Sequence, residues 1–94
     1  MTYRMIAKRM SGGTEVRHVR TFKAEFESPQ GAKLGAELSR EEVVKIILGG
    51  KDRFYVVGDD GSEADCEVVD AKPRYVKSTP DRSKRDNLLS LPDF

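Results

Sequence analysis

The side chains available to build a hydrophobic core are few, and this scarcity limits what the chain can fold into. Leu, Ile, Val and Phe together make up 22 of the 94 residues. Chains in which these residues fall below about 20% and the net charge is high are typically disordered. Here the net charge is only +1. We therefore expect one small folded domain with a lean core and a stability of about 5–10 kcal/mol.

Alternation of apolar and polar residues predicts most of the strands. It indicates strands at residues 3–10, 16–27 and 63–70. Residues 53–57 also read as a strand, and residues 75–77 as a short last strand. A turn is expected at Ser11-Gly12-Gly13, and a second at Asp59-Asp60-Gly61, because both carry the glycine that hairpin turns favour. Residues 28–38 are expected to form a turn and a loop.

A single helix is predicted between the two groups of strands. Ser39-Arg40-Glu41-Glu42 has the pattern of a capping box, in which the Ser39 hydroxyl and the Glu42 carboxylate bind each other's backbone N–H groups. Apolar residues follow at helical spacing, and Gly49-Gly50 supplies the end of the helix. The order ββ-α-ββ(β) indicates an α+β fold: a single antiparallel sheet of four to five strands with one helix on one face.

We expect residues 1–77 to form the domain and residues 78–94 to form a polar loop followed by an apolar tail. No apolar segment approaches the length of about 20 residues that a membrane span needs, and the N-terminus lacks the apolar region of a signal peptide. A single cysteine fits a reducing compartment. The expected location is therefore the cytoplasm, without membrane association.

The residues that most often carry catalysis or bind metal are scarce. Cys66 is the only cysteine and His18 the only histidine, so an internal disulfide and a Cys/His zinc site are excluded. The acidic neighbours of Cys66 oppose formation of a thiolate, which favours a buried strand residue over a nucleophile. His18 falls among the apolar positions of its predicted strand, which favours a hydrogen-bonded strand histidine over a general base. We expect no enzyme activity, no metal and no cofactor.

Charge is distributed unevenly along the chain. Residues 1–23 carry a net charge of +5, residues 24–71 carry −7, and residues 72–94 carry +3. If the two basic ends pair in one sheet, one side of the domain becomes basic and could bind the phosphates of a nucleic acid. The residues of this predicted strip are Arg4, Lys8, Arg17, Lys23, Lys72, Arg74 and Lys77.

The apolar tail is the other candidate for a functional surface. Four large apolar side chains lie within its last seven residues: Leu88, Leu89, Leu91 and Phe94. An exposed patch of this kind would mark a binding site for a partner. Alternatively, the tail folds back to complete the lean core of its own domain, or it crosses to a second copy and builds a homodimer.

The last third of the chain resembles the C-terminal pattern of a small bacterial family of unknown function. The resemblance rests on Tyr75-Val-Lys-Ser-Thr79 and on Asn87-Leu-Leu-Ser-Leu-Pro92, with weaker support from Tyr3-Arg4-Met5-Ile6 and from Phe54-Tyr55-Val56. Members commonly carry a cysteine just after this motif, where the present chain has Asp93-Phe94. The resemblance implies a bacterial cytoplasmic protein and no particular activity.

Two functions remain after these exclusions. The first is a small non-enzymatic module that acts by protein–protein interaction or self-association, because an apolar terminal motif stands beside no catalytic set. The alternative is a nucleic-acid-binding domain that uses the basic strip.

Overall fold

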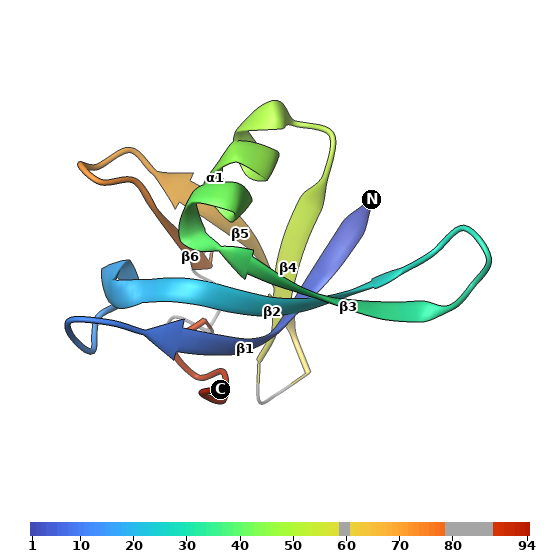
Figure 1. Ribbon diagram of the computed structural model, residues 1–94, viewed down its shortest axis with the longest axis horizontal. Helices are drawn as coiled ribbons and strands as arrows, with labels where there is room; N and C mark the ends of the chain where they lie inside the picture. Colours follow the sequence, from blue (N-terminus) through green and yellow to red (C-terminus); the bar gives the residue numbers. More distant parts are fainter. Residues whose placement is uncertain (59–60, 79–87) are drawn as a thin grey trace.

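The computed structural model describes residues 1–58, 61–78 and 88–94. These residues form a six-stranded mixed sheet with one α-helix and a 3-10 turn, in the strand order β3-β2-β1-β4-β5-β6 (Figure 1). The fold is thus α+β with a single sheet. The elements are β1 (Thr2–Met10), η1 (Val16–His18), β2 (Val19–Glu27), β3 (Lys33–Ser39), α1 (Arg40–Gly49), β4 (Arg53–Val57), β5 (Glu63–Val69) and β6 (Tyr75–Ser78).

The sheet differs from the prediction in the number and direction of its strands. Residues 33–38, expected to be part of a loop, belong to β3, which pairs with β2 along its whole length to Ser39. Gly35 and Ala36 give this segment a low intrinsic strand preference, so its conformation comes from pairing with β2. Strands β1 and β4 are parallel rather than antiparallel, because α1 lies in the connection that carries the chain back to the start of β1.

The second predicted strand starts later than expected. Residues 16–18 form the 3-10 turn η1, in which the His18 N–H donates to the carbonyl of Glu15. The Nδ1 atom of His18 accepts the backbone N–H of Glu15 at 3.1 Å. His18 is therefore a turn residue and not a strand residue. A predicted hairpin turn at 59–61 and the predicted polar loop at 78–87 fall mostly outside the described residues.

The predicted helix is confirmed with its capping box. The Oγ atom of Ser39 accepts the Glu42 N–H at 3.1 Å, and the Ser39 N–H donates to the Glu42 carboxylate at 3.2 Å. Gly50 ends the helix with a φ of +75°, in the left-handed region that favours glycine. The helix contacts β2, β3, β5 and β6, so it covers one face of the sheet.

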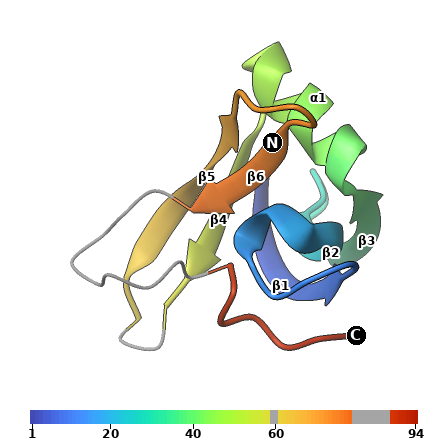
Figure 2. The same ribbon diagram turned by 90° about the vertical axis from the view of Figure 1, so that its left-hand side faces the viewer.

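The sheet curls until its last strand approaches its second. Strand β6 contacts η1, at the start of β2, so the sheet forms an incomplete barrel around the core (Figure 2). The largest fully buried side chains include Phe22, Phe54 and Met5. Cys66 is also buried, as expected for a strand residue that faces the core.

Candidate functional site

The C-terminal tail packs on its own domain. Strands β1 and β4 pair only near the start of β1, from Thr2 to Arg4, and the tail occupies the edge of β1 beyond that point. The Lys8 N–H donates to the carbonyl of Pro92 at 2.9 Å, and the Phe94 N–H donates to the carbonyl of Lys8 at 3.0 Å. Leu88 is fully buried in the core, and Leu89 and Leu91 pack against that core. The leucines of the tail therefore pack in or against the core of their own chain.

Two residues of the predicted basic strip lie beside the tail. The Lys8 amine is buried, where it donates to the carbonyl of Leu91 at 2.7 Å and to the Asp93 carboxylate at 2.8 Å. A register irregularity between Met5 and Ala7 places Lys8 opposite the buried Phe22, which simple alternation does not predict. The Phe94 ring lies 4.7 Å from the Lys23 amine and 4.5 Å from the guanidinium carbon of Arg9.

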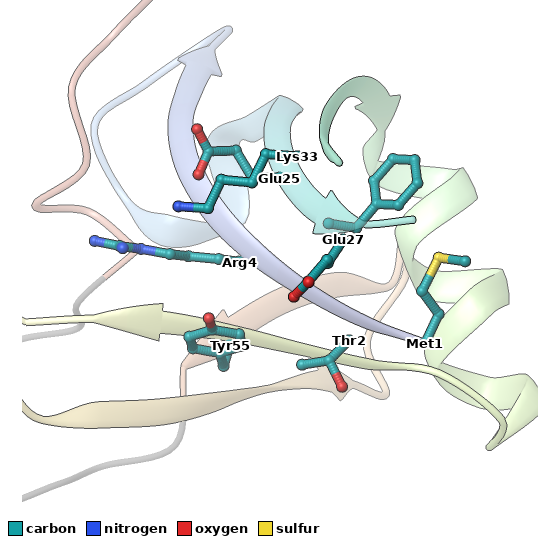
Figure 3. Close-up of a pocket in the computed structure, with 8 residues that line it drawn as sticks. Met1, Thr2, Arg4, Glu25, Glu27, Lys33 and Tyr55 are labelled. Atoms are coloured by element: carbon teal, nitrogen blue, oxygen red, sulfur yellow. The ribbon is translucent and has the colours of Figure 1, made fainter. Parts of the chain in front are cut away.

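Arg4 lies on the exposed outer face of the sheet. It lines a shallow pocket with Glu25, Glu27, Lys33 and other residues of the first four strands (Figure 3). Arg4 is paired in register with Glu25, and Lys33 with Glu27. Because the charges of this pocket balance, it favours neither an anion nor a cation.

Arg74 and Lys77 belong to the edge formed by β5, β6 and their connection. Arg74 lies 3.2 Å from the Asp70 carboxylate, and Lys77 lies 3.4 Å from the Glu67 carboxylate. Both pairs are largely exposed, so they contribute little to stability.

The remaining two residues of the strip, Arg17 and Lys72, line the same groove. The groove has a volume of about 470 Å³ and lies between η1, the start of β2, the first turn of α1 and the β5–β6 connection. We call it the Arg40 groove. None of its lining residues is acidic: Arg17, His18, Arg20, Arg40, Ala71, Lys72, Pro73 and Tyr75.

Arg40 is the unusual residue of this groove. It is only 4% exposed, although it is the first residue of α1, where the helix dipole disfavours a cation. Its Nη1 atom donates to the carbonyl of Arg17 at 3.2 Å, and its Nη2 atom donates to the Glu41 carboxylate at 3.4 Å. Its Nε–H is buried and has no acceptor among the described residues. A hydrogen bond from the backbone N–H of Glu41 and the adjacent Arg40 guanidinium lower the pKa of the Glu41 carboxyl below its usual value.

The outer edge of β3 is the second candidate surface. The hairpin of β2 and β3 extends away from the helix and the tail (Figure 1). The rings of Phe54 and Tyr3 stack at 4.6 Å, and Tyr3 contacts Phe26 at 5.3 Å. Phe26 is paired with Leu34, which is 46% exposed. A row of apolar side chains thus crosses the sheet and ends at its open edge.

A family of sequences described as "Protein of unknown function (DUF3892)" matches residues 4–92. The chain belongs to the DUF3892 family. This confirms the expected membership of an uncharacterised family, and the match extends into the C-terminal tail as far as Pro92. No curated protein and no solved structure matches the chain.

Sequence reasoning missed two arginines of this DUF3892 domain that matter most for the Arg40 groove. Arg20 lay in the predicted second strand, and Arg40 lay inside the capping box. A signal for Arg40 was present, because a cation at the first position of a helix is electrostatically unfavourable and calls for a specific reason.

Among the described residues, no group of three or more His, Cys, Asp or Glu side chains is arranged to hold a metal ion. That part of the chain also contains no helix with the length and apolarity to cross a bilayer.

Proposed function

We propose that this protein is a small non-enzymatic module that self-associates through the edge of β3. Two copies would pair their β3 strands antiparallel about a two-fold axis and join their sheets into one. The observation that supports this proposal is the self-complementary sequence of the edge.

The outward-facing backbone groups of β3 follow from its hairpin. The Ser28 N–H donates to the carbonyl of Ala32, so this pair is hydrogen-bonded. Hydrogen-bonded and non-hydrogen-bonded pairs alternate along an antiparallel ladder. The backbone groups of Lys33, Gly35 and Glu37 therefore point away from β2, where a second strand can bind them.

A two-fold axis at Gly35 matches both the backbone and the side chains. It pairs Lys33 of each copy with Glu37 of the other, so two ion pairs of opposite charge form on the outer face. On the inner face it pairs Leu34 with Ala36 of the second copy, which covers the exposed end of the apolar row. Cross-strand pairs of this kind contribute about 0.2–1 kcal/mol each.

Charge reversal tests the pairing. Lys33→Glu or Glu37→Lys would place like charges opposite each other at both symmetric positions, and we expect each variant to raise the dimer Kd about tenfold. The double variant restores opposite charges between copies, so its dimer Kd should return toward that of the wild type. Sedimentation equilibrium over a range of protein concentrations measures all four proteins.

The double variant also separates association from monomer stability. Within one chain Lys33 is opposite Glu27 and Glu37 is opposite Lys23, so both substitutions create like-charge pairs inside the monomer. Recovery of the dimer in the double variant therefore cannot come from a more stable monomer. Gly35→Pro is a second test, because it removes one outward N–H that the dimer needs and an edge strand tolerates proline there. A wild-type protein that stays monomeric, or a Gly35→Pro variant that still dimerises, would refute the proposal.

The alternative of nucleic-acid binding along a strip of seven basic residues has less support. Only Arg17 and Lys72 share a groove, Lys8 is buried under the tail, and Arg4 faces acidic neighbours. The seven residues therefore do not form one continuous path for a phosphate backbone.

A further inference from the structure

The buried guanidinium of Arg40 has an unused hydrogen-bond donor beside an open groove. Its Nε–H is buried without an acceptor among the described residues. Leaving a charged donor unsatisfied is among the more costly defects in a folded protein. Since Arg40 lines the groove, a rotation of its guanidinium toward the groove would let an anion bound there accept this hydrogen bond.

The surroundings of Arg40 favour an anion with more than one negative charge. Arg20 and Lys72 are exposed on the walls of the groove. Arg17 has a carboxylate partner in Glu15 at 3.0 Å, which lies outside the lining of the groove. His18 uses Nδ1 as an acceptor, which leaves the N–H of Nε2 as the donor of its ring. Guanidinium groups bind carboxylates and phosphates alike with two parallel hydrogen bonds, so the preference comes from charge: several cations around one groove suit a doubly charged phosphate monoester better than a singly charged carboxylate.

A second, more apolar groove adjoins this one. It has a volume of about 420 Å³ and shares Arg40 and Pro73 with the Arg40 groove. Its walls include Val44 and Leu48, and Leu48 is 58% exposed. A ligand that places its anionic group on Arg40 can therefore lay an apolar or aromatic body across Pro73 toward Leu48.

We propose that the Arg40 groove binds a phosphate monoester whose organic body occupies the adjoining apolar groove. A nucleoside monophosphate and the 5′-phosphate end of a nucleic-acid strand share this chemistry. This inference is independent of self-association through β3.

Titrations followed by 15N NMR test the site directly. The probes are inorganic phosphate, AMP and adenosine, at constant ionic strength, and the readout is the Nε–H resonance of Arg40. We expect AMP to shift this resonance and to bind more tightly than inorganic phosphate, and adenosine to leave it unchanged. A resonance that moves with none of the probes, or with adenosine as much as with AMP, would overturn the proposal.

Variants assign the binding to the groove. Arg20→Gln and Lys72→Gln alter exposed side chains, and each should weaken AMP binding about tenfold through the loss of a charge-assisted hydrogen bond. Glu41→Gln should strengthen binding, because Glu41 competes with the ligand for Arg40. Arg4→Gln makes the same change of charge on the outer face and should have no effect. Equal weakening by Arg4→Gln and Arg20→Gln would show non-specific attraction and would refute the site.

Binding of a short single-stranded oligonucleotide, measured with and without a 5′-phosphate, distinguishes a mononucleotide ligand from the end of a nucleic-acid strand. Tighter binding of the phosphorylated strand than of AMP, with little binding of the unphosphorylated strand, identifies a strand end as the ligand. Binding of AMP at least as tight as that of the phosphorylated strand identifies a mononucleotide. If both strands bind equally, the terminal phosphate is not recognised and the proposal is wrong.

Discussion

Replacing Leu88 with alanine should test whether the tail is an integral part of the core. Leu88 lies in the last segment of the chain, yet it is fully buried among core residues. Leu→Ala substitutions at buried sites cost about 2–5 kcal/mol, from lost burial and the cavity left behind. We expect Leu88→Ala to lower the free energy of unfolding by about 3 kcal/mol. For a domain of this size each kcal/mol shifts Tm by roughly 4–8 °C, so the fall in Tm should exceed about 10 °C.

Urea denaturation followed by circular dichroism measures the free energy of unfolding, and thermal melts give Tm. Leu48→Ala is the matched control, because Leu48 is 58% exposed on α1. The control should change the free energy of unfolding by no more than about 0.5 kcal/mol. A loss of less than about 1 kcal/mol for Leu88→Ala would mean that the tail rests on the surface, and the account of the tail as part of the core would fail.

Three further changes probe the helix and the turn beside the Arg40 groove. Ser39→Ala removes the helix cap and should cost about 1 kcal/mol in urea denaturation; no loss would show that the capping box does not stabilise α1. Gly13→Ala would place a methyl group against the His18 ring, so the ring must move, and the NMR signals of His18 should shift; unchanged signals would refute the close packing. A hydrogen bond from its own backbone N–H and the neighbouring Arg40 lower the pKa of the Glu41 carboxyl from its ordinary value of 4.5. The ionised carboxylate therefore stabilises the folded state above pH 4.5, and this stabilisation is lost as the pH falls through the lower pKa of the folded state. The loss is small because Glu41 is exposed, and Glu41→Gln should abolish that part of the pH dependence in melts between pH values of about 3 and 7.

The helix is the element that local sequence specifies most completely. Its start depends on hydrogen bonds between Ser39 and Glu42, and its end depends on the conformation of Gly50. All of these interactions join residues close in sequence, so a pattern is enough to predict them. Strand β5, which alternates in sequence, and strand β4, a run of aromatic and β-branched residues, were predictable for the same reason.

The position of β3 and the burial of Lys8 depend on interactions between distant segments. Residues 33–39 have little preference for a strand until β2 supplies a pairing partner. Lys8 is buried because a register irregularity in β1 turns it toward Phe22 and because the tail provides its acceptors. Neither cause can be read from the residues around Lys8 in the sequence.

The sequence predicted some of the residues of the candidate site but not how they come together. Basic residues at both ends of the chain suggested an anion-binding surface, and Arg17 and Lys72 do line one groove. Arg20 and Arg40 complete it because β6 curls back to contact η1, beside the first turn of α1. Charge counting cannot show this, since the separation of two side chains in space depends on the curvature of the sheet.

The sequence by itself determined that this chain forms a small α+β fold with a lean core and a capped helix, and that it carries one cysteine and one histidine. These properties follow from composition and from contacts between near neighbours. Only the tertiary structure decided that the sheet is mixed, that Leu88 completes the core, and that Arg40 lies buried beside a basic groove. These features arise from pairing and packing between segments far apart in the chain, where many arrangements satisfy the same local pattern.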